Sequence, residues 1–190
     1  MNVLHIDSSI SGENSASRAL TAAIVSDFKA GDAGASVTYR DLVADPLDHL
    51  TLPGFASAQS QAVLAEFEAA DVIVIGAPMY NFTIPTQPKA WLDRILIAGK
   101  TFRYTATGPE GLAGAKRVIV AIARGGVYGE GSAQRSTEHA ETYLRDAFAF
   151  IGISAPEFVI AEGLAMGPEP RAASIEAAHA AVAGLGLSAA

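Results

Sequence analysis

The sequence predicts an α/β fold: a doubly wound sheet of five parallel strands with helices on both faces. First, five short strand-like segments alternate with five segments of helical periodicity along the 190 residues, and this alternation is typical of parallel sheets. Second, the most apolar segments are continuous runs, as expected of strands buried on both faces. Third, half of the residues are hydrophobic and no repeat or linker interrupts the chain, so we expect a single domain over residues 1–190.

The expected elements alternate strictly along the chain. Strands are expected at Val3–Ile6, Ser36–Arg40, Asp71–Gly76, Arg117–Ala123 and Glu157–Ala161. Helices are expected at Ala16–Ala30, Gln59–Ala70, Thr86–Ala98, Ala133–Ile151 and Arg171–Leu185. The first helix shows its pattern clearly, because Leu20, Ile24 and Phe28 recur on one face. The segments Asp41–Ala58 and Thr101–Ala115 are expected to be long loops, and loops of this length are often functional.

Five units of this kind favour the flavodoxin-like strand order 2-1-3-4-5, with a switch point between the first and third strands. Ligands of open α/β sheets bind outside the carboxyl ends of the strands. The order therefore brings the loop after Ile6 next to the loop after Gly76, and we expect a ligand where they meet.

The loop after the first strand is rich in serine. Five serines lie within ten residues, from Ser8 to Ser17, directly before the first helix. Free N–H groups and the helix dipole favour an anion at a helix N-terminus, and serine hydroxyls add donors without charge. The loop is neither a P-loop nor a dinucleotide fingerprint, because both glycine patterns are absent. It is interpreted as a phosphate cradle, and a serine cap in a polar loop is the alternative.

The loop after the third strand carries aromatic and amide side chains. Pro78 prevents the apolar run from continuing as a central strand, and Met79, Tyr80, Asn81 and Phe82 follow it. Aromatic faces suit a flat heteroaromatic ring, and the amide offers a donor and an acceptor together. The alternative is an apolar loop that only caps the core.

Glycines follow the fourth strand. Gly125, Gly126, Gly129 and Gly131 come shortly after Ala123. Glycine lets the backbone approach a ligand closely and present bare N–H groups. The position at the carboxyl end of a strand beside the third strand favours a ligand, and a flexible turn is the alternative.

Composition narrows the classes of function. The formal net charge of −7 and the lack of a Lys/Arg cluster argue against nucleic-acid binding. The apolar runs are shorter than a membrane span and the chain opens without a signal-peptide pattern, so we expect a cytoplasmic protein with no membrane partner. The chain has no Cys for a disulfide or a nucleophile. No metal is expected, because His5, His49, His139 and His179 lack metal-ligand spacing.

Two other classes of protein are disfavoured by single positions. A phospho-receiver domain needs a carboxylate at the end of the third strand, where this chain has Ala77 and Pro78. A serine hydrolase needs a Gly-x-Ser-x-Gly elbow, which is absent. Asp7 is expected to be a strand-end or capping carboxylate rather than a catalytic one, and Trp91 a packing residue of the third helix.

Several sequence blocks together resemble the FMN-dependent NADH-azoreductases, which are also quinone reductases of the flavodoxin-like superfamily. The resemblance covers nearly the whole chain. Its strongest blocks are Ala77–Phe82, Phe102–Thr105 and Gly108–Leu112. Further matching pieces are Ser8-Ser9, Ser15–Ser17, Arg124–Gly126, Phe150–Ile153 and Ala161–Gly163. No block is decisive alone, but together they are specific.

The resemblance implies a set of site residues. The FMN phosphate would be held by Ser9, Ser15, Ala16 and Ser17, and the isoalloxazine ring by Met79, Tyr80, Asn81 and Phe82. The pyrimidine side of the ring would lie along Gly125 and Gly126, with Ala123 and Arg124 beside them. The substrate pocket would include Tyr104, Phe150 and Tyr128, the first two contributed across a homodimer interface. The chain departs from the pattern at Ala123, where some relatives carry Ser, and at Asp41–Ala58, a connection that normally helps roof the pocket and is shorter here.

The implied activity is NAD(P)H:quinone oxidoreduction together with reductive cleavage of azo bonds. Electrons would pass from NADH or NADPH to FMN and then to a small-molecule quinone or azo compound, in ping-pong order. An FMN electron carrier of the flavodoxin type, which serves protein partners, is the alternative that shares fold and cofactor. Oxidation of NADH with a small quinone separates the two.

Overall fold

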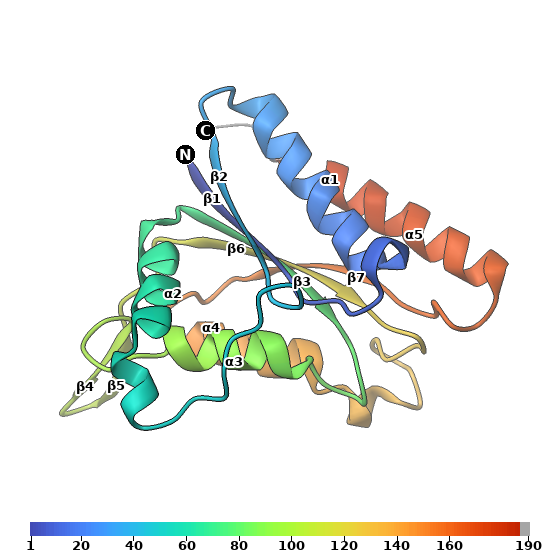
Figure 1. Ribbon diagram of the computed structural model, residues 1–190. Helices are drawn as coiled ribbons and strands as arrows, with labels where there is room; N and C mark the ends of the chain where they lie inside the picture. Colours follow the sequence, from blue (N-terminus) through green and yellow to red (C-terminus); the bar gives the residue numbers. More distant parts are fainter. Residues whose placement is uncertain (187–190) are drawn as a thin grey trace.

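The computed structural model describes residues 1–186 and forms a sheet of parallel strands between two layers of helices (Figure 1). The strands are β1 (Asn2–Asp7), β2 (Ser36–Asp41), β3 (Val72–Pro78), β6 (Arg117–Ala123) and β7 (Glu157–Ala161). They lie in the order β2-β1-β3-β6-β7. This is the predicted order 2-1-3-4-5, because β4 and β5 form a separate hairpin, so the predicted topology is confirmed.

The helices divide between the two faces of the sheet (Figure 1). One face carries α1 (Ala16–Gly31) and α5 (Pro168–Ala183), and the other carries α2 (Ala58–Ala69), α3 (Thr86–Ile95) and α4 (Ala140–Phe150). Trp91 of α3 is fully buried and meets Phe67 of α2 edge-on, with ring centroids 6.0 Å apart. The expectation that Trp91 is a packing residue is confirmed.

The central strand β3 is buried along its whole length. Val72 and Val74 belong to the core beneath α1 and α5, whereas Ile73 and Ile75 belong to the core beneath α2, α3 and α4. Burial of each such side chain contributes roughly 1.5–3 kcal/mol. The apolar run is continuous rather than alternating because helices cover both faces.

The segment Thr101–Ala115, predicted as a long loop, contains an antiparallel hairpin. Its strands are β4 (Phe102–Thr105) and β5 (Gly108–Gly111). Nε and Nη2 of Arg103 donate to the Glu110 carboxylate at 2.8 and 2.9 Å and link the two strands. The sequence of β5, Gly-Pro-Glu-Gly, has no alternation of apolar residues, so periodicity could not predict it.

The predicted start of the fourth helix at Ala133 is wrong. A 3₁₀ turn occupies Arg135–Thr137, and α4 begins at Ala140. Glu138 sets this start, because its carboxylate accepts from the backbone N–H groups of Ala140, Glu141 and Thr142 at 2.8–3.1 Å. Glu138 lies two residues before the helix and does not interrupt the helical periodicity of the sequence. Periodicity alone therefore could not show where α4 begins.

Residues 1–186 contain neither a membrane-spanning helix nor a metal cluster. None of the helices in this range is both long and apolar enough to cross a bilayer. No three or more His, Asp or Glu side chains of these residues gather so that they could hold a metal ion. Residues 187–190, the end of the predicted domain, lie outside the described part of the chain.

Candidate functional site

A cavity of about 240 Å³ lies at the carboxyl edge of the sheet, where β1, β3 and β6 end. The serine-rich loop, the loop after β3, the glycine loop after β6 and the connection from β7 to α5 line it. The lining residues are Ser9, Ser11, Asn14, Ser15, Ala16, Pro78, Met79, Tyr80, Ala123, Arg124, Gly125, Leu164 and Arg171. The cavity therefore lies where the strand order predicts a ligand site.

The hydroxyl of Tyr80 joins the serine-rich loop to the loop after β3. It accepts from the backbone N–H of Ile10 at 3.2 Å and lies 3.3 Å from Oγ of Ser9. Ser8 adds a second link, because its hydroxyl donates to the carbonyl of Gly76 at 2.6 Å. The two loops that the topology is predicted to bring together are thus in direct contact.

Two serines organise the N-terminus of α1. Ser15 caps the helix, with Oγ accepting from the backbone N–H of Arg18 at 3.2 Å. Oγ of Ser17 is fully buried behind it, 3.1 Å from Oγ of Ser15. Ser15 and Ala16 line the cavity, whereas Ser17 does not. The capping interpretation is confirmed, and the cradle stays a prediction that the cap does not oppose, because a capped N-terminus still offers N–H groups and the positive end of the dipole.

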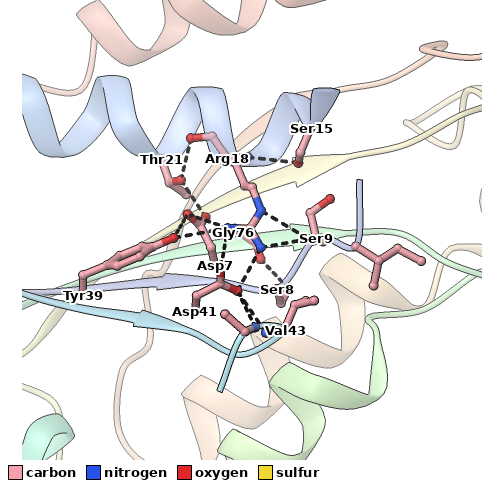
Figure 2. Close-up of polar contacts among 12 residues, drawn as sticks. Asp7, Ser8, Ser9, Ser15, Arg18, Thr21, Tyr39, Asp41, Val43 and Gly76 are labelled. Carbon is pink, nitrogen blue, oxygen red and sulfur yellow. Dashed lines mark hydrogen bonds and ion pairs between the residues drawn. The ribbon is translucent and has the colours of Figure 1, made fainter. Parts of the chain in front are cut away.

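Figure 2 shows how Arg18 holds the serine-rich loop from behind. Nη1 and Nη2 donate to the Asp41 carboxylate at 2.8 and 2.9 Å, and Nε and Nη2 donate to the carbonyl of Ser9 at 3.2 and 2.9 Å. The hydrogen bond from Arg18 lowers the pKa of Asp41, and burial opposes this effect only in part. The backbone of Ser9 is therefore fixed by a side chain that does not itself line the cavity.

Asp7, the last residue of β1, is buried beside the contacts that Arg18 makes with Asp41 and Ser9 (Figure 2). Its carboxylate accepts from the hydroxyl of Thr21 at 2.9 Å and that of Tyr39 at 3.1 Å. Burial, and then the charge of Asp7, raises the pKa of Tyr39. A Cβ at position 76 would lie 2.7 Å from Oδ1 of Asp7, so only glycine fits at Gly76. Asp7 ties β1, β2 and α1 together, in keeping with a strand-end carboxylate.

The loop after β3 turns back on itself tightly. Tyr80 and Thr83 exchange backbone hydrogen bonds of 2.9 and 3.2 Å. Between them, Asn81 and Phe82 both have positive φ, 48° and 76°, as a type I′ turn requires. A bulky residue in this region costs on the order of 1–3 kcal/mol. The backbone N–H of His139 donates to the carbonyl of Phe82 at 2.9 Å and secures the turn. Both central side chains are exposed and neither lines the cavity.

The glycine loop after β6 presents N–H groups rather than carbonyls. The carbonyls of Arg124, Gly125 and Gly126 accept from backbone N–H groups of the segment 163–165 at 2.8–3.1 Å. Within residues 1–186, the N–H groups of Gly125 and Gly126 have no protein acceptor. Gly125 lines the cavity and Gly126 does not. Two adjacent free donors suit a ligand atom that carries negative charge.

Arg124 lines the cavity, but its guanidinium is held by carboxylates of the scaffold. The guanidinium is 1% exposed and lies 3.2 Å from Glu138, 2.8 Å from Glu141 and 3.4 Å from Glu162. Burial raises the pKa of Glu138, but donors from the first turn of α4 and the charge of Arg124 outweigh burial, so this pKa is lowered. Glu162 also accepts from the N–H of Tyr128 at 2.9 Å. The cluster fastens the glycine loop to α4.

The three aromatic residues predicted for a substrate pocket lie outside this cavity. Tyr128 lines a neighbouring cavity of about 380 Å³ together with Arg124 and Glu162. Tyr104 lies on β4 and is 74% exposed, and Phe150 ends α4. The hairpin and the end of α4 lie at the amino edge of the sheet, opposite the cavity (Figure 1).

Five lining residues were not predicted as site residues: Ser11, Asn14, Pro78, Leu164 and Arg171. Nη2 of Arg171, in the first turn of α5, donates to the carbonyl of Asn14 at 3.3 Å. For Leu164 and Arg171 the available signal was topological, because the connection after β7 starts from the same edge of the sheet as the other loops. Its residue types alone show no ligand pattern.

Known proteins resemble this chain in sequence and in fold. A family model described as a flavodoxin-like fold matches residues 1–185. The chain is 55% identical over 197 residues to an FMN-dependent NADH:quinone oxidoreductase of Xanthomonas campestris pv. campestris, with 95% of this chain and 97% of that protein covered. It is 56% identical over 185 residues to the FMN-dependent NADH:quinone oxidoreductase 2 of Bradyrhizobium diazoefficiens, with 90% and 92% covered. The crystal structure of an azoreductase from Bacillus anthracis str. Sterne matches it with a TM-score of 0.89 at 28% identity, with 97% and 98% covered.

Proposed function

Because the chain belongs to the flavodoxin-like family of these FMN-dependent NADH:quinone oxidoreductases, we propose that it has their activity and also cleaves azo bonds. NADH, a proton and a quinone give NAD⁺ and a hydroquinone. Cleavage of an azo bond to two amines consumes two NADH and two protons. FMN supplies the two-electron chemistry that connects donor and acceptor when it is bound.

The observation that carries the proposal is the junction of a phosphate cradle with a ring-binding surface in one cavity. Ser9, Ser15 and Ala16 hold the phosphate at the N-terminus of α1, because hydroxyls, backbone N–H groups and the helix dipole converge there. Ser17 supports Ser15 from behind through their 3.1 Å hydroxyl contact.

The ring lies against the other half of the cavity. Met79 and Tyr80 provide an apolar and aromatic wall, and Asn81 and Phe82 extend it on the tight turn. The N–H groups of Gly125 and Gly126, with Ala123 and Arg124 beside them, would hold the pyrimidine side of the ring. Preorganised N–H donors stabilise negative charge on the ring in the way that an oxyanion hole does. Water delivers the protons.

The active form is a homodimer with two shared sites. Tyr104 and Phe150 lie at the edge of the sheet opposite their own cavity, so they can line a substrate pocket only when a second copy supplies them. Exposed apolar side chains on and after the hairpin, Tyr104 and Leu112, support this arrangement. Tyr128 completes the pocket from the same copy as the cofactor. A monomer at micromolar concentration in sedimentation, with full activity, contradicts the shared pocket.

The partners are small molecules, with NADH or NADPH as the donor and quinones or azo compounds as acceptors. The formal net charge of −7 disfavours nucleic acid, and a cytoplasmic location without a membrane partner is part of the proposal. A flavodoxin-type carrier is the competing class, and it reduces protein partners only.

Cofactor binding is tested with serine variants. The variant S15A/S17A should retain FMN more weakly, because each hydrogen bond to a charged phosphate contributes roughly 1.5–3 kcal/mol. The measurement is the dissociation constant of FMN by flavin fluorescence. S57A is the matched control. Oγ of Ser57 caps α2 by accepting from the backbone N–H of Ser60, as Oγ of Ser15 does for α1, and Ser57 does not line the cavity. Equal affinity of S15A/S17A and wild type contradicts the phosphate assignment.

The reaction class is tested by steady-state kinetics with NADH and a benzoquinone. One site that serves both substrates in turn gives parallel double-reciprocal lines, and intersecting lines contradict it. Azo dyes should be reduced more slowly than quinones, because cleavage needs two rounds of reduction. Turnover with protein acceptors alone establishes the flavodoxin-type carrier instead.

A further inference from the structure

We propose that Arg171 is the side-chain cation that binds the FMN phosphate, and that it makes the site select FMN over unphosphorylated riboflavin. The inference rests on the proposed function and adds a residue from a part of the chain outside the serine-rich loop. Arg171 lies in the first turn of α5, more than 150 residues after Ser15. It acts by direct contact with the phosphate.

The fold brings Arg171 to the phosphate end of the cavity. Helices α1 and α5 lie side by side on one face of the sheet (Figure 1), and both begin at its carboxyl edge. Arg171 lines the cavity together with Ser9, Ser15 and Asn14. Its Nη2 donates to the carbonyl of Asn14 at 3.3 Å, which places the guanidinium beside the loop that leads into α1.

The other two arginines near the cavity are committed to protein carboxylates and carbonyls, and only the buried Nε of Arg124 has no partner among the described residues. Arg18 directs its donors to Asp41 and to the carbonyl of Ser9. Arg124 is enclosed by three glutamates. Within the part of the chain that the structure describes, Arg171 makes one side-chain hydrogen bond and no ion pair. Most of its five N–H donors therefore remain available.

A cation would add to what the neutral donors of this cavity offer a phosphate. The serine hydroxyls and N–H groups are neutral, and the chain as a whole carries a formal net charge of −7, which disfavours a second negative charge in its field. A guanidinium matches two phosphate oxygens with a planar pair of donors and is stronger than a neutral donor. Riboflavin lacks the phosphate, so it gains nothing from this contact.

The test measures dissociation constants of FMN and riboflavin, by flavin fluorescence, for wild type, R171A, R171K and K29A. Loss of charge-assisted hydrogen bonds should weaken FMN binding by R171A roughly 10- to 100-fold, while riboflavin binding stays at the wild-type value. R171K should recover part of the loss. K29A is the matched control, because it removes one positive charge from the far end of α1, and it should bind both flavins like wild type.

Other outcomes contradict either the contact between Arg171 and the phosphate or FMN binding itself. Equal weakening of FMN and riboflavin by R171A shows that Arg171 only tethers Asn14, and it overturns the phosphate contact. Wild-type affinity of R171A for FMN also overturns it. Wild-type protein that binds neither flavin overturns the proposed function together with the role of Arg171. The unfolding midpoint of R171A without flavin confirms that the variant is folded.

Discussion

Arg18 and Arg124 hold the two halves of the same cavity, and they do so in different electrostatic settings. Arg18 fixes the serine-rich loop through hydrogen bonds to Asp41, with the Asp7 carboxylate 3.7 Å away, and its side chain is 18% exposed. Arg124 fixes the glycine loop among three carboxylates, Glu138, Glu141 and Glu162, at 1% exposure. In each case the guanidinium lies behind the loop and leaves its surface to the ligand.

The difference in burial predicts different roles: Arg18 holds one loop in place, whereas Arg124 is part of the buried core. Breaking a partly exposed ion pair lowers the free energy of unfolding only a little, because water solvates the partner that remains. A buried arginine among carboxylates is different, because its removal leaves charges that nothing compensates. We therefore expect loss of Arg18 to loosen one loop, and loss of Arg124 to destabilise the whole fold.

The largest expected effect is that of R124M. The variant keeps an unbranched apolar side chain but removes the buried cation beside Glu138, which is fully buried, and leaves Glu138 and Glu141 with the more exposed Arg135 and Arg145 as counter-ions. Removal of one partner from a buried cluster costs about 3–5 kcal/mol, so the free energy of unfolding should fall by that amount in urea denaturation.

R135M is the matched control for this prediction. Arg135 also contacts the Glu138 carboxylate, at 3.4 Å, but from an exposed position. Its loss should cost less than about 1 kcal/mol. Similar costs for R124M and R135M contradict the division between the two arginines.

A smaller effect is expected of R18M, and it should appear in binding as well as in stability. The variant removes the hydrogen bonds of a partly exposed side chain to Asp41 and to the Ser9 carbonyl, so the free energy of unfolding should fall by about 0.5–1.5 kcal/mol. FMN affinity should also fall, because the Ser9 loop loses its support. The measurements are urea denaturation and flavin fluorescence.

R40M sharpens this second prediction. Arg40 forms a comparable two-pronged pair with Glu66, at 2.7 and 2.8 Å, but does not touch the serine-rich loop. It should lower stability to a similar extent and leave FMN affinity unchanged. A loss of FMN affinity in both variants shows that stability, and not the position of Ser9, controls binding.

The same two arginines mark what the sequence can and cannot predict. Strand order follows from apolar runs and alternation, and it correctly brought the loops after β1 and β3 together. The family resemblance places Arg124 at the cofactor together with Gly125 and Gly126, and the residue does line the cavity, but a resemblance does not show that its guanidinium lies among three glutamates. Arg18 was not assigned at all, because its partner Asp41 is in another strand. The capping by Glu138 and the hairpin after α3 likewise depend on contacts that periodicity does not record.

The smallest expected effect concerns how stability changes at low pH, and it distinguishes Asp41, held by Arg18, from Glu138, held by Arg124. The pKa of Asp41 is lowered chiefly by its hydrogen bond from Arg18. A carboxyl whose pKa is lower in the folded state contributes stability above its unfolded pKa, about 3.9, and loses it as the pH falls through the folded value. D41N should therefore be less stable than wild type at pH 7 by at most about 1 kcal/mol, since the pair is partly exposed.

This deficit of D41N should shrink as the pH falls below about 4, because wild-type Asp41 then loses its own contribution as the pH approaches and passes its lowered folded-state pKa. Urea midpoints at pH 7 and pH 3 measure the change. E138Q should show the same sign, since the pKa of Glu138 is also lowered, but with a larger deficit at pH 7 because that carboxylate is fully buried and caps α4. A deficit of D41N that is the same at both pH values means that its cause is lost packing rather than charge, and the clamp on Ser9 then does not depend on an ionised Asp41.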